Sequence, residues 1–151
     1  MKLPEQVDVE LTSGDENISG LIVEMKVTAG NKNPYYIYFP KTDKNGKSLL
    51  KQEDIIGQFN DYNEVSMMDY NGTTEAANPE VEITLFDYSG MLKNKDVILG
   101  FPLSSYEKTR WKSRQEKYDY MISCENGKFK LPPTMINLEK TSDIKLEIEK
   151  R

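Results

Sequence analysis

The sequence predicts a single domain, residues 1–151, with a mainly β fold: an antiparallel β-sandwich of seven to nine strands with one or two short helices. Apolar and polar residues alternate over several short segments, which is the period of a strand with one buried face. Residues that favour turns separate these segments. With 151 residues and 37% hydrophobic side chains, the chain can bury one core without disulfides or a metal.

The first two predicted strands cover residues 6–11 and 21–27. In each of them, Val, Leu and Met alternate with Asp, Glu and Lys. A turn is expected over residues 13–17, where Ser, Gly, Asp and Asn gather. Because the two strands follow each other closely in the chain, we expect them to pair antiparallel.

The third predicted strand covers residues 35–39 and ends at Pro40, which has no N–H to donate to a sheet. It carries large side chains on both faces, so we expect it in the centre of its sheet. The turn over residues 41–47 contains Asn45 and Gly46, which suit positive φ. Its acidic residues lack the glycine and glutamate spacing of a calcium loop, which favours a simple turn.

The remaining elements follow the same patterns. Residues 48–50 predict a short strand, and 51–59 one or two helical turns. Further strands are expected at 65–70, 81–86, 97–101 and 144–148. The segment 103–118 fits a helix with a capping box and fits a loop equally well. Residues 118–124 and 128–131 predict a hairpin around Asn126 and Gly127.

Composition excludes several kinds of chemistry. The chain has no histidine, which removes imidazole acid–base catalysis and imidazole metal ligands. Cys124 is the single cysteine, and no glycine-rich nucleotide loop is present, so no cofactor is expected. The net charge of −5 disfavours nucleic acid as a partner. The first residues form no apolar signal segment and no apolar run reaches the length of a membrane helix, which predicts a soluble, cytoplasmic protein.

The segment 107–118 has the most distinctive local charge. It holds five basic and two acidic residues around an aromatic pair, in an otherwise acidic chain. Tryptophan and arginine commonly anchor protein interfaces, and the acidic remainder of the chain would repel a polyanion. A solvated helix or loop is the alternative interpretation. The predicted partner-binding residues are Arg110, Trp111, Arg114 and Tyr118.

One family resemblance covers the first third of the chain. Residues 19–23 (Ser-Gly-Leu-Ile-Val), then 36–39 (Tyr-Ile-Tyr-Phe) leading into Thr42-Asp-Lys-Asn-Gly-Lys, resemble transthyretin-like (prealbumin-like) modules, including the carboxypeptidase regulatory-like domain. The spacing from Gly20 to Thr42 is longer than in that family, and the family's tail of Tyr and apolar residues is not evident. The resemblance implies a mostly antiparallel sandwich used for binding or structural support.

The sequence therefore favours a non-catalytic protein that binds a protein partner. A small acidic inhibitor or immunity-type protein is one alternative, since it would suit the size and charge of the chain. A carbohydrate-binding module is another, in which the tyrosines of residues 35–39 would stack on a sugar. Because those tyrosines divide between two faces, core packing is the stronger expectation for them.

Overall fold

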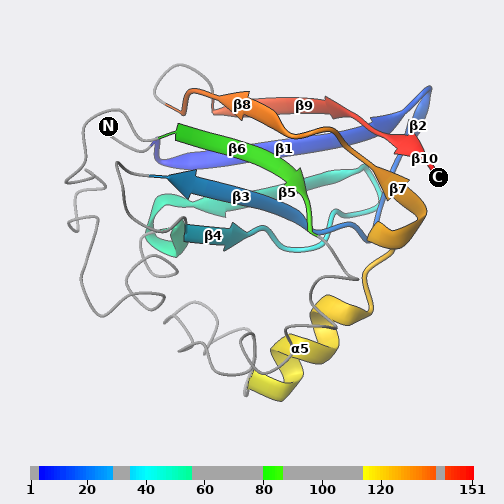
Figure 1. Ribbon diagram of the computed structural model, residues 1–151, viewed down its shortest axis with the longest axis horizontal. Helices are drawn as coiled ribbons and strands as arrows, with labels where there is room; N and C mark the ends of the chain where they lie inside the picture. The colour runs from blue at the N-terminus through cyan, green and yellow to red at the C-terminus, as the bar shows by residue number, and fades with distance from the viewer. Residues whose placement is uncertain (1–3, 29–34, 56–79, 87–113, 139–141) are drawn as a thin grey trace.

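The computed structural model describes residues 4–28, 35–55, 80–86, 114–138 and 142–151, which form a two-layer β-sandwich with a helix beside it (Figure 1). The predicted fold class is confirmed: strands dominate, and nearly all of their pairings are antiparallel. The described residues contain ten strands, one more than the predicted maximum, and three of them are only two residues long.

The first layer, called sheet one, is built around the N-terminal strand β1 (Gln6–Ser13). Strand β5 (Lys47–Lys51) pairs antiparallel with one side of β1, and β9 (Asp143–Glu147) pairs parallel with the other. The short strand β2 (Glu16–Asn17) folds back on the end of β1 as a tight hairpin. The first and last long strands of the chain are therefore neighbours (Figure 1).

The second layer, called sheet two, is antiparallel throughout, in the order β4-β3-β6-β8. A separate two-stranded ladder joins β7 to β10 near the C-terminus. The helix α5 lies below the sheets in the view of Figure 1. The bounds of these elements are β3 (Val23–Thr28), β4 (Tyr35–Tyr38), β6 (Glu80–Leu85), α5 (Arg114–Ile122), the 3-10 turn η1 (Asn126–Lys128), β7 (Phe129–Lys130), β8 (Thr134–Ile136) and β10 (Glu149–Lys150).

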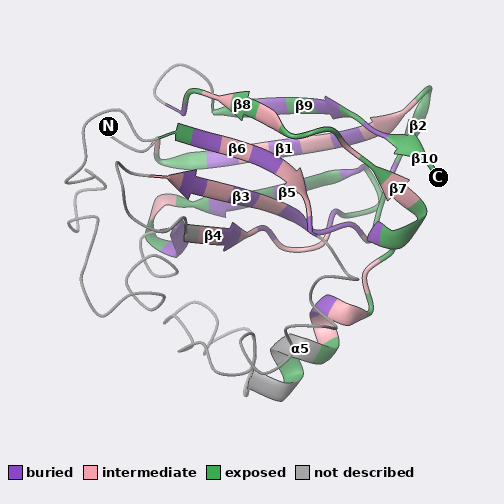
Figure 2. Cartoon of the chain, viewed as in Figure 1, coloured by how far each residue is buried: buried purple, intermediate pink, exposed green. Residues whose placement is uncertain are grey.

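The core lies between the two sheets and comes from the alternating positions of the strands (Figure 2). This follows from strand geometry, because every second side chain points to the same face of a sheet. The opposite faces of β1, β5 and β9 carry mostly polar residues, together with the exposed Leu49 of β5. The fully buried large side chains include Leu11, Leu21, Met25, Ile37, Phe39, Leu50 and Ile83.

The first two predicted strands do not pair with each other, so that expectation was wrong. Strand β1 belongs to sheet one and β3 to sheet two. The segment between them crosses from one layer to the other, with Ile18 and Leu21 buried on the way. Thr42 fixes this crossing: its hydroxyl donates to the carbonyl of Ile18 at 2.7 Å and accepts from the amide of Leu21 at 3.1 Å.

Strand β4 lies at the edge of sheet two, not at the centre as predicted. It pairs with β3, and no second described strand pairs with it. β4 has apolar side chains on both faces for another reason. One face packs into the core, and the other packs against a second apolar cluster that lies outside the sandwich. There, the ring of Tyr38 meets Phe86 edge-on, with 5.5 Å between the ring centroids, and Met121 of α5 is buried in the same cluster.

The predicted hairpin around Asn126 and Gly127 is also wrong. Residues 118–122 belong to the helix α5, and Asn126 begins a 3-10 turn with its side chain 3% exposed. The amide of Asn126 donates to the carbonyls of Ile22 and Phe86 at 2.8 and 2.9 Å, and its oxygen accepts from the Ile22 amide at 2.8 Å. This asparagine therefore joins the residue that precedes β3 to the residue that follows β6, and it does not form the tip of a hairpin.

The other predicted elements divide into two groups. The strands expected at 6–11, 48–50, 81–86 and 144–148 are confirmed as β1, β5, β6 and β9, and residues 52–55 are helical as expected. Strand β8 was not predicted. The strands expected at 65–70 and 97–101, and the segment 103–113, lie outside the described residues.

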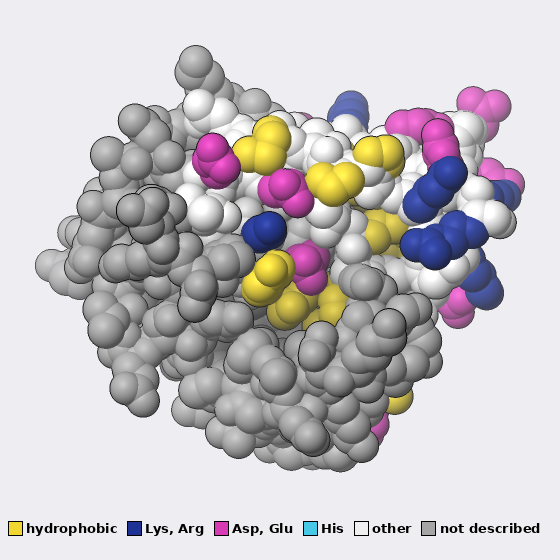
Figure 3. Space-filling view, in the orientation of Figure 1, with side chains coloured by type: hydrophobic (Ala, Val, Ile, Leu, Met, Phe, Trp, Pro, Cys, Tyr) yellow, Lys and Arg dark blue, Asp and Glu magenta, His cyan; other side chains and the backbone are white. Residues whose placement is uncertain are grey.

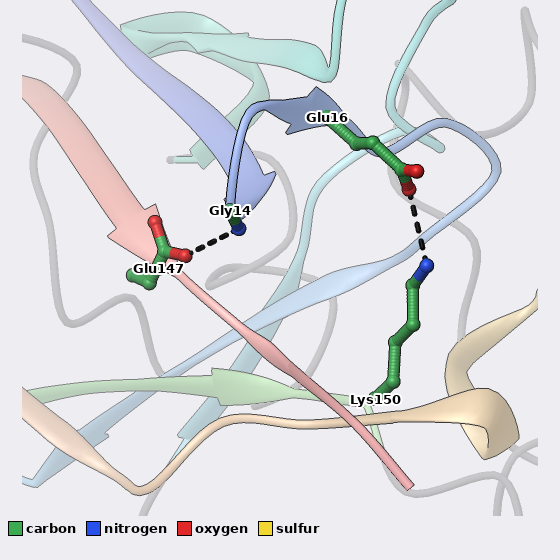
Figure 4. Close-up of polar contacts among 4 residues, drawn as sticks. All are labelled: Gly14, Glu16, Glu147 and Lys150. Atoms are coloured by element: carbon green, nitrogen blue, oxygen red, sulfur yellow. Dashed lines mark hydrogen bonds and ion pairs between the residues drawn. The ribbon is translucent and has the colours of Figure 1, made fainter.

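The C-terminal strands hold the β1–β2 turn (Figure 4). One carboxylate oxygen of Glu147 accepts from the backbone N–H of Gly14 at 2.6 Å, and the other accepts from the hydroxyl of Thr12 at 2.9 Å. Lys150 forms an ion pair with Glu16 at 3.2 Å across the same turn (Figure 4). These contacts tie the end of the chain to its first hairpin.

Candidate functional site

The outer face of sheet one carries two rows of side chains that cross its three long strands. The register aligns Leu49, Asp8 and Asp143 in one row, and it aligns Lys47, Glu10 and Lys145 in the next. In the second row an acidic residue lies between two basic ones, which favours pairing across the strands. The first row begins at an exposed leucine and ends in two neighbouring carboxylates.

These rows line a hollow with a volume of about 760 Å³. Pro40, Lys41 and Asp43, which follow β4, form a further part of the wall of the hollow. The volume lies within the range of ligand sites, but such sites are mostly apolar, and this lining mixes four acidic side chains with three basic ones. A polar lining of this kind is typical of the rim of a protein interface.

The turn after β4 organises one end of this hollow. One oxygen of the Asp43 carboxylate accepts from the backbone amides of Asn45 and Lys47, at 2.8 and 3.0 Å. The amides of Lys47 and then of Asn45 hold the pKa of Asp43 below its usual value, because they stabilise the ionised form. This carboxylate therefore closes its own turn, in agreement with the expectation of a simple turn.

Gly46 fits this turn closely against β1. Its φ of +73° is one that glycine adopts readily, and its carbonyl accepts from the amide of Leu11 at 2.8 Å. A Cβ at this position would lie 2.5 Å from the carbonyl oxygen of Leu11. The glycine thereby sets how near the turn lies to β1, and with it the position of β5.

Strand β5 forms one edge of sheet one. At its two ends, the Leu11 amide donates to the Gly46 carbonyl and the Gln52 amide donates to the Glu5 carbonyl, both at 2.8 Å. Backbone groups alternate in direction along an antiparallel pair, so the N–H and C=O groups of Ser48 point toward β1 and those of Leu49 and Lys51 point away. We call the outward backbone groups and side chains of Leu49 and Lys51 the β5 edge.

The sequence-predicted site lies mostly outside the part of the chain that the structure describes. Arg110 and Trp111 fall in the undescribed segment 87–113. Arg114 and Tyr118 fall within α5. The structure therefore places two of the four predicted residues on one helix and leaves the other two unplaced.

Helix α5 is attached to the turn after β4. The hydroxyl of Tyr120 accepts from the backbone amide of Lys41 at 2.8 Å, and the ammonium of Lys41 lies 4.2 Å from the centre of the Tyr120 ring. The same ammonium donates to the hydroxyl of Ser123. Lys41 thus connects the helix that carries Arg114 with the wall of the hollow.

The outer face of sheet two offers a less coherent surface. Its visible described part mixes hydrophobic, acidic and basic side chains, and the basic ones gather near β7 and β10 (Figure 3). Two of those lysines are paired with glutamates: Lys128 with Glu125 at 2.6 Å and Lys130 with Glu149 at 3.3 Å. Large hydrophobic exposure in the described residues is confined to Leu49 on β5 and Met135 on β8.

Sequence reasoning missed the hollow and the β5 edge. The pattern Lys-Ser-Leu-Leu-Lys of β5 places both lysines and one leucine on the outer face, which is the single signal that was available. It did not show which strand lies at an edge, because strand order depends on contacts between distant segments. The importance of Asn126 was also hidden, because its neighbour Gly127 made the pair resemble a turn.

Two observations concern metal and membrane chemistry. In the described part of the chain, no group of three or more Cys, Asp or Glu side chains is arranged to hold a metal ion, and no helix is both long and apolar enough to cross a bilayer. Cys124 is half-buried, and burial raises the pKa of its thiol.

No family model, curated protein or solved structure matches this chain.

Proposed function

We propose that this chain is a non-catalytic binding protein that engages a protein partner through the hollow and the β5 edge. The observation that carries the proposal is the exposed Leu49, 43% accessible, beside a hollow lined by charges of both signs. An apolar contact surrounded by a polar rim is the usual composition of an interface between proteins. Asp43 supports a binding role over an acid–base role, because its carboxylate is engaged by its own turn.

The basic segment extends this proposal. Trp111 and Arg110 are proposed to contact the partner, together with Arg114 and Tyr118 on α5. The attachment of α5 to Lys41 supports this grouping, because Lys41 also lines the hollow. One partner could then contact the hollow and the helix together.

The proposal includes a cytoplasmic location and a resemblance of the first third of the chain to transthyretin-like modules. The single cysteine supports the location, since the chain needs no oxidising compartment for a disulfide. The two-layer, mostly antiparallel architecture supports the resemblance of the first third of the chain to that family. An inhibitor or immunity-type role would be one form of the same binding function, and it predicts a basic partner bound one to one.

A carbohydrate-binding role has less support. Tyr36 and Tyr38 share the outer face of β4, as the alternation predicted, but Tyr38 uses its ring to pack against Phe86. That leaves one aromatic ring of the pair without a described packing role, whereas a sugar platform uses exposed rings. A glycan array with no signal would remove this alternative.

The test is capture of a partner from the native host on the immobilised full chain, followed by titration with the purified partner. The substitution Trp111→Ala is expected to weaken binding at least about tenfold, as removal of an interface anchor does, while the melting temperature changes little. Tyr36→Ala is the matched aromatic control and is expected to leave binding unchanged.

Two outcomes would contradict the proposal. If Trp111→Ala unfolds the protein, the residue belongs to the core and the basic segment is not the interface. If the full chain captures no protein under conditions in which it remains folded, the binding function itself fails.

A further inference from the structure

We propose that the β5 edge binds an extended acidic peptide segment of the partner as an added strand. This inference rests on the binding function proposed above and specifies its mode and its ligand. An exposed sheet edge offers a row of backbone donors and acceptors to an extended peptide, and neighbouring side chains then select its sequence. Strand β5 presents both features in the described structure.

The backbone of β5 provides the first part of the argument. The N–H and C=O groups of Leu49 and Lys51 point away from β1, and the described residues offer them no backbone partner on that side. Lys47 points the same way, but its amide donates to the Asp43 carboxylate and its carbonyl accepts from the Asp43 amide at 2.8 Å. The Asp43 turn therefore closes one end of the edge and fixes where an added strand can begin.

The side chains of β5 provide the second part. Lys47, Leu49 and Lys51 all project from the outer face, and Leu49 is 43% exposed. Residues opposite each other on neighbouring strands share a face, so an added residue opposite Leu49 would contact its side chain. The residue opposite Lys51 would lie two positions away along the added strand, before it in an antiparallel pairing and after it in a parallel one. The edge thus selects an apolar residue with an acidic one two positions away.

The same charges disfavour a second copy of this chain as the occupant. If two β5 strands paired antiparallel about Leu49, Lys47 of each copy would lie opposite Lys51 of the other. Like charges directly opposite each other destabilise a strand pair. An acidic segment would instead place carboxylates beside the lysines of β5, where a second copy would place more lysines.

The probe for this proposal is a synthetic capped heptapeptide, Thr-Glu-Thr-Val-Thr-Glu-Thr, labelled with fluorescein for anisotropy at low salt. Its valine and its two glutamates lie on one face when the peptide is extended. A peptide with lysine in place of both glutamates is the matched control. We expect saturable binding of the acidic peptide by the full chain, weakened by added salt, and no saturable binding of the basic peptide.

Three variants separate strand addition from other contacts. Leu49→Pro removes an N–H that faces the edge and leaves the bonds to β1 intact, so it is expected to fold and to bind about tenfold more weakly. Lys51→Glu reverses a charge at the edge and is expected to weaken binding about three- to tenfold. Lys130→Glu makes the same reversal on β7, outside sheet one and the hollow, and is expected to leave binding unchanged.

Each outcome decides the proposal. It is overturned if the acidic peptide shows no saturation up to about 1 mM, or if folded Leu49→Pro binds it as the natural chain does. It is equally overturned if sedimentation shows that the chain dimerises and Leu49→Pro abolishes the dimer. If Leu49→Pro binds the captured partner with unchanged affinity, strand addition at β5 is refuted while the proposed binding function is retained.

Discussion

The side-chain amide of Asn126 should contribute more to stability than any other single polar group described in this fold. It makes three hydrogen bonds, all to buried backbone groups of Ile22 and Phe86, with lengths of 2.8, 2.8 and 2.9 Å. The two donors and one acceptor match these groups, so the orientation of the amide is determined. The side chain is 3% exposed, and water has little access to replace it.

The substitution Asn126→Ala is expected to lower the free energy of unfolding by about 3 kcal/mol. Each lost hydrogen bond costs about 1 kcal/mol net. The Ile22 amide and the Phe86 carbonyl would lose their bond to Asn126, while the Ile22 carbonyl would keep the bond from the Phe86 amide at 2.9 Å. In urea, with a slope of about 2 kcal/mol per M, this shifts the unfolding midpoint by about 1.5 M. The assay is urea unfolding at pH 7, followed by circular dichroism.

Asn17→Ala is the matched control, because Asn17 is exposed on β2. It is expected to change the free energy of unfolding by less than about 0.5 kcal/mol. A midpoint shift for Asn126→Ala as small as that of Asn17→Ala would refute the reasoning. It would mean that Asn126 does not join Ile22 to Phe86 in solution.

Two further predictions concern the turn that positions β5. Gly46→Ala is expected to lower the free energy of unfolding by more than about 2 kcal/mol, because the new Cβ would lie 2.5 Å from the carbonyl oxygen of Leu11. Gly14 also has a positive φ, +61°, but open space surrounds it, so Gly14→Ala is expected to cost about 1 kcal/mol. Equal losses in melting temperature would contradict this. The lowered pKa of Asp43 predicts that its stabilising effect is present above its ordinary pKa and is lost as pH falls through the folded value. The stability difference between the natural chain and Asp43→Asn should therefore shrink in acid, and a difference that grows in acid would contradict the assigned cause.

The sequence was most informative where one strand carries a clear alternation. Residues 6–11, 81–86 and 144–148 each have one apolar face, and each forms a strand as predicted. Alternation reports which side chains are buried, but it does not report which strand lies beside which. This is why the pairing of the first two strands and the central position of β4 were predicted wrongly.

The failures at β4 and α5 share a physical cause. The second apolar cluster lies outside the sandwich and joins Ile22, Phe86 and Met121, which are far apart in the chain. Its existence gave β4 two apolar faces and gave residues 118–124 an apparent alternation. Local pattern cannot reveal a cluster assembled from three distant segments.

The candidate site could be predicted only in part, for the same reason. The basic segment was recognised from composition, but the β5 edge depends on strand order. The two lysines and one leucine on the outer face of β5 indicate a binding edge only when the strand is known to lie at the edge of a sheet. The hollow likewise requires Pro40 and Lys41 to lie beside strands that are distant in sequence.

Backbone hydrogen exchange on β5 tests the central claim most directly. In the free chain, the amides of Ser48 and Leu50 should exchange slowly because they bond to β1, while those of Leu49 and Lys51 should exchange rapidly. Saturating acidic heptapeptide is expected to slow Leu49 and Lys51 selectively, because an added strand would accept from their N–H groups. Protection of Leu49 and Lys51 in the free chain, or rapid exchange that the bound peptide leaves unchanged, would contradict the account.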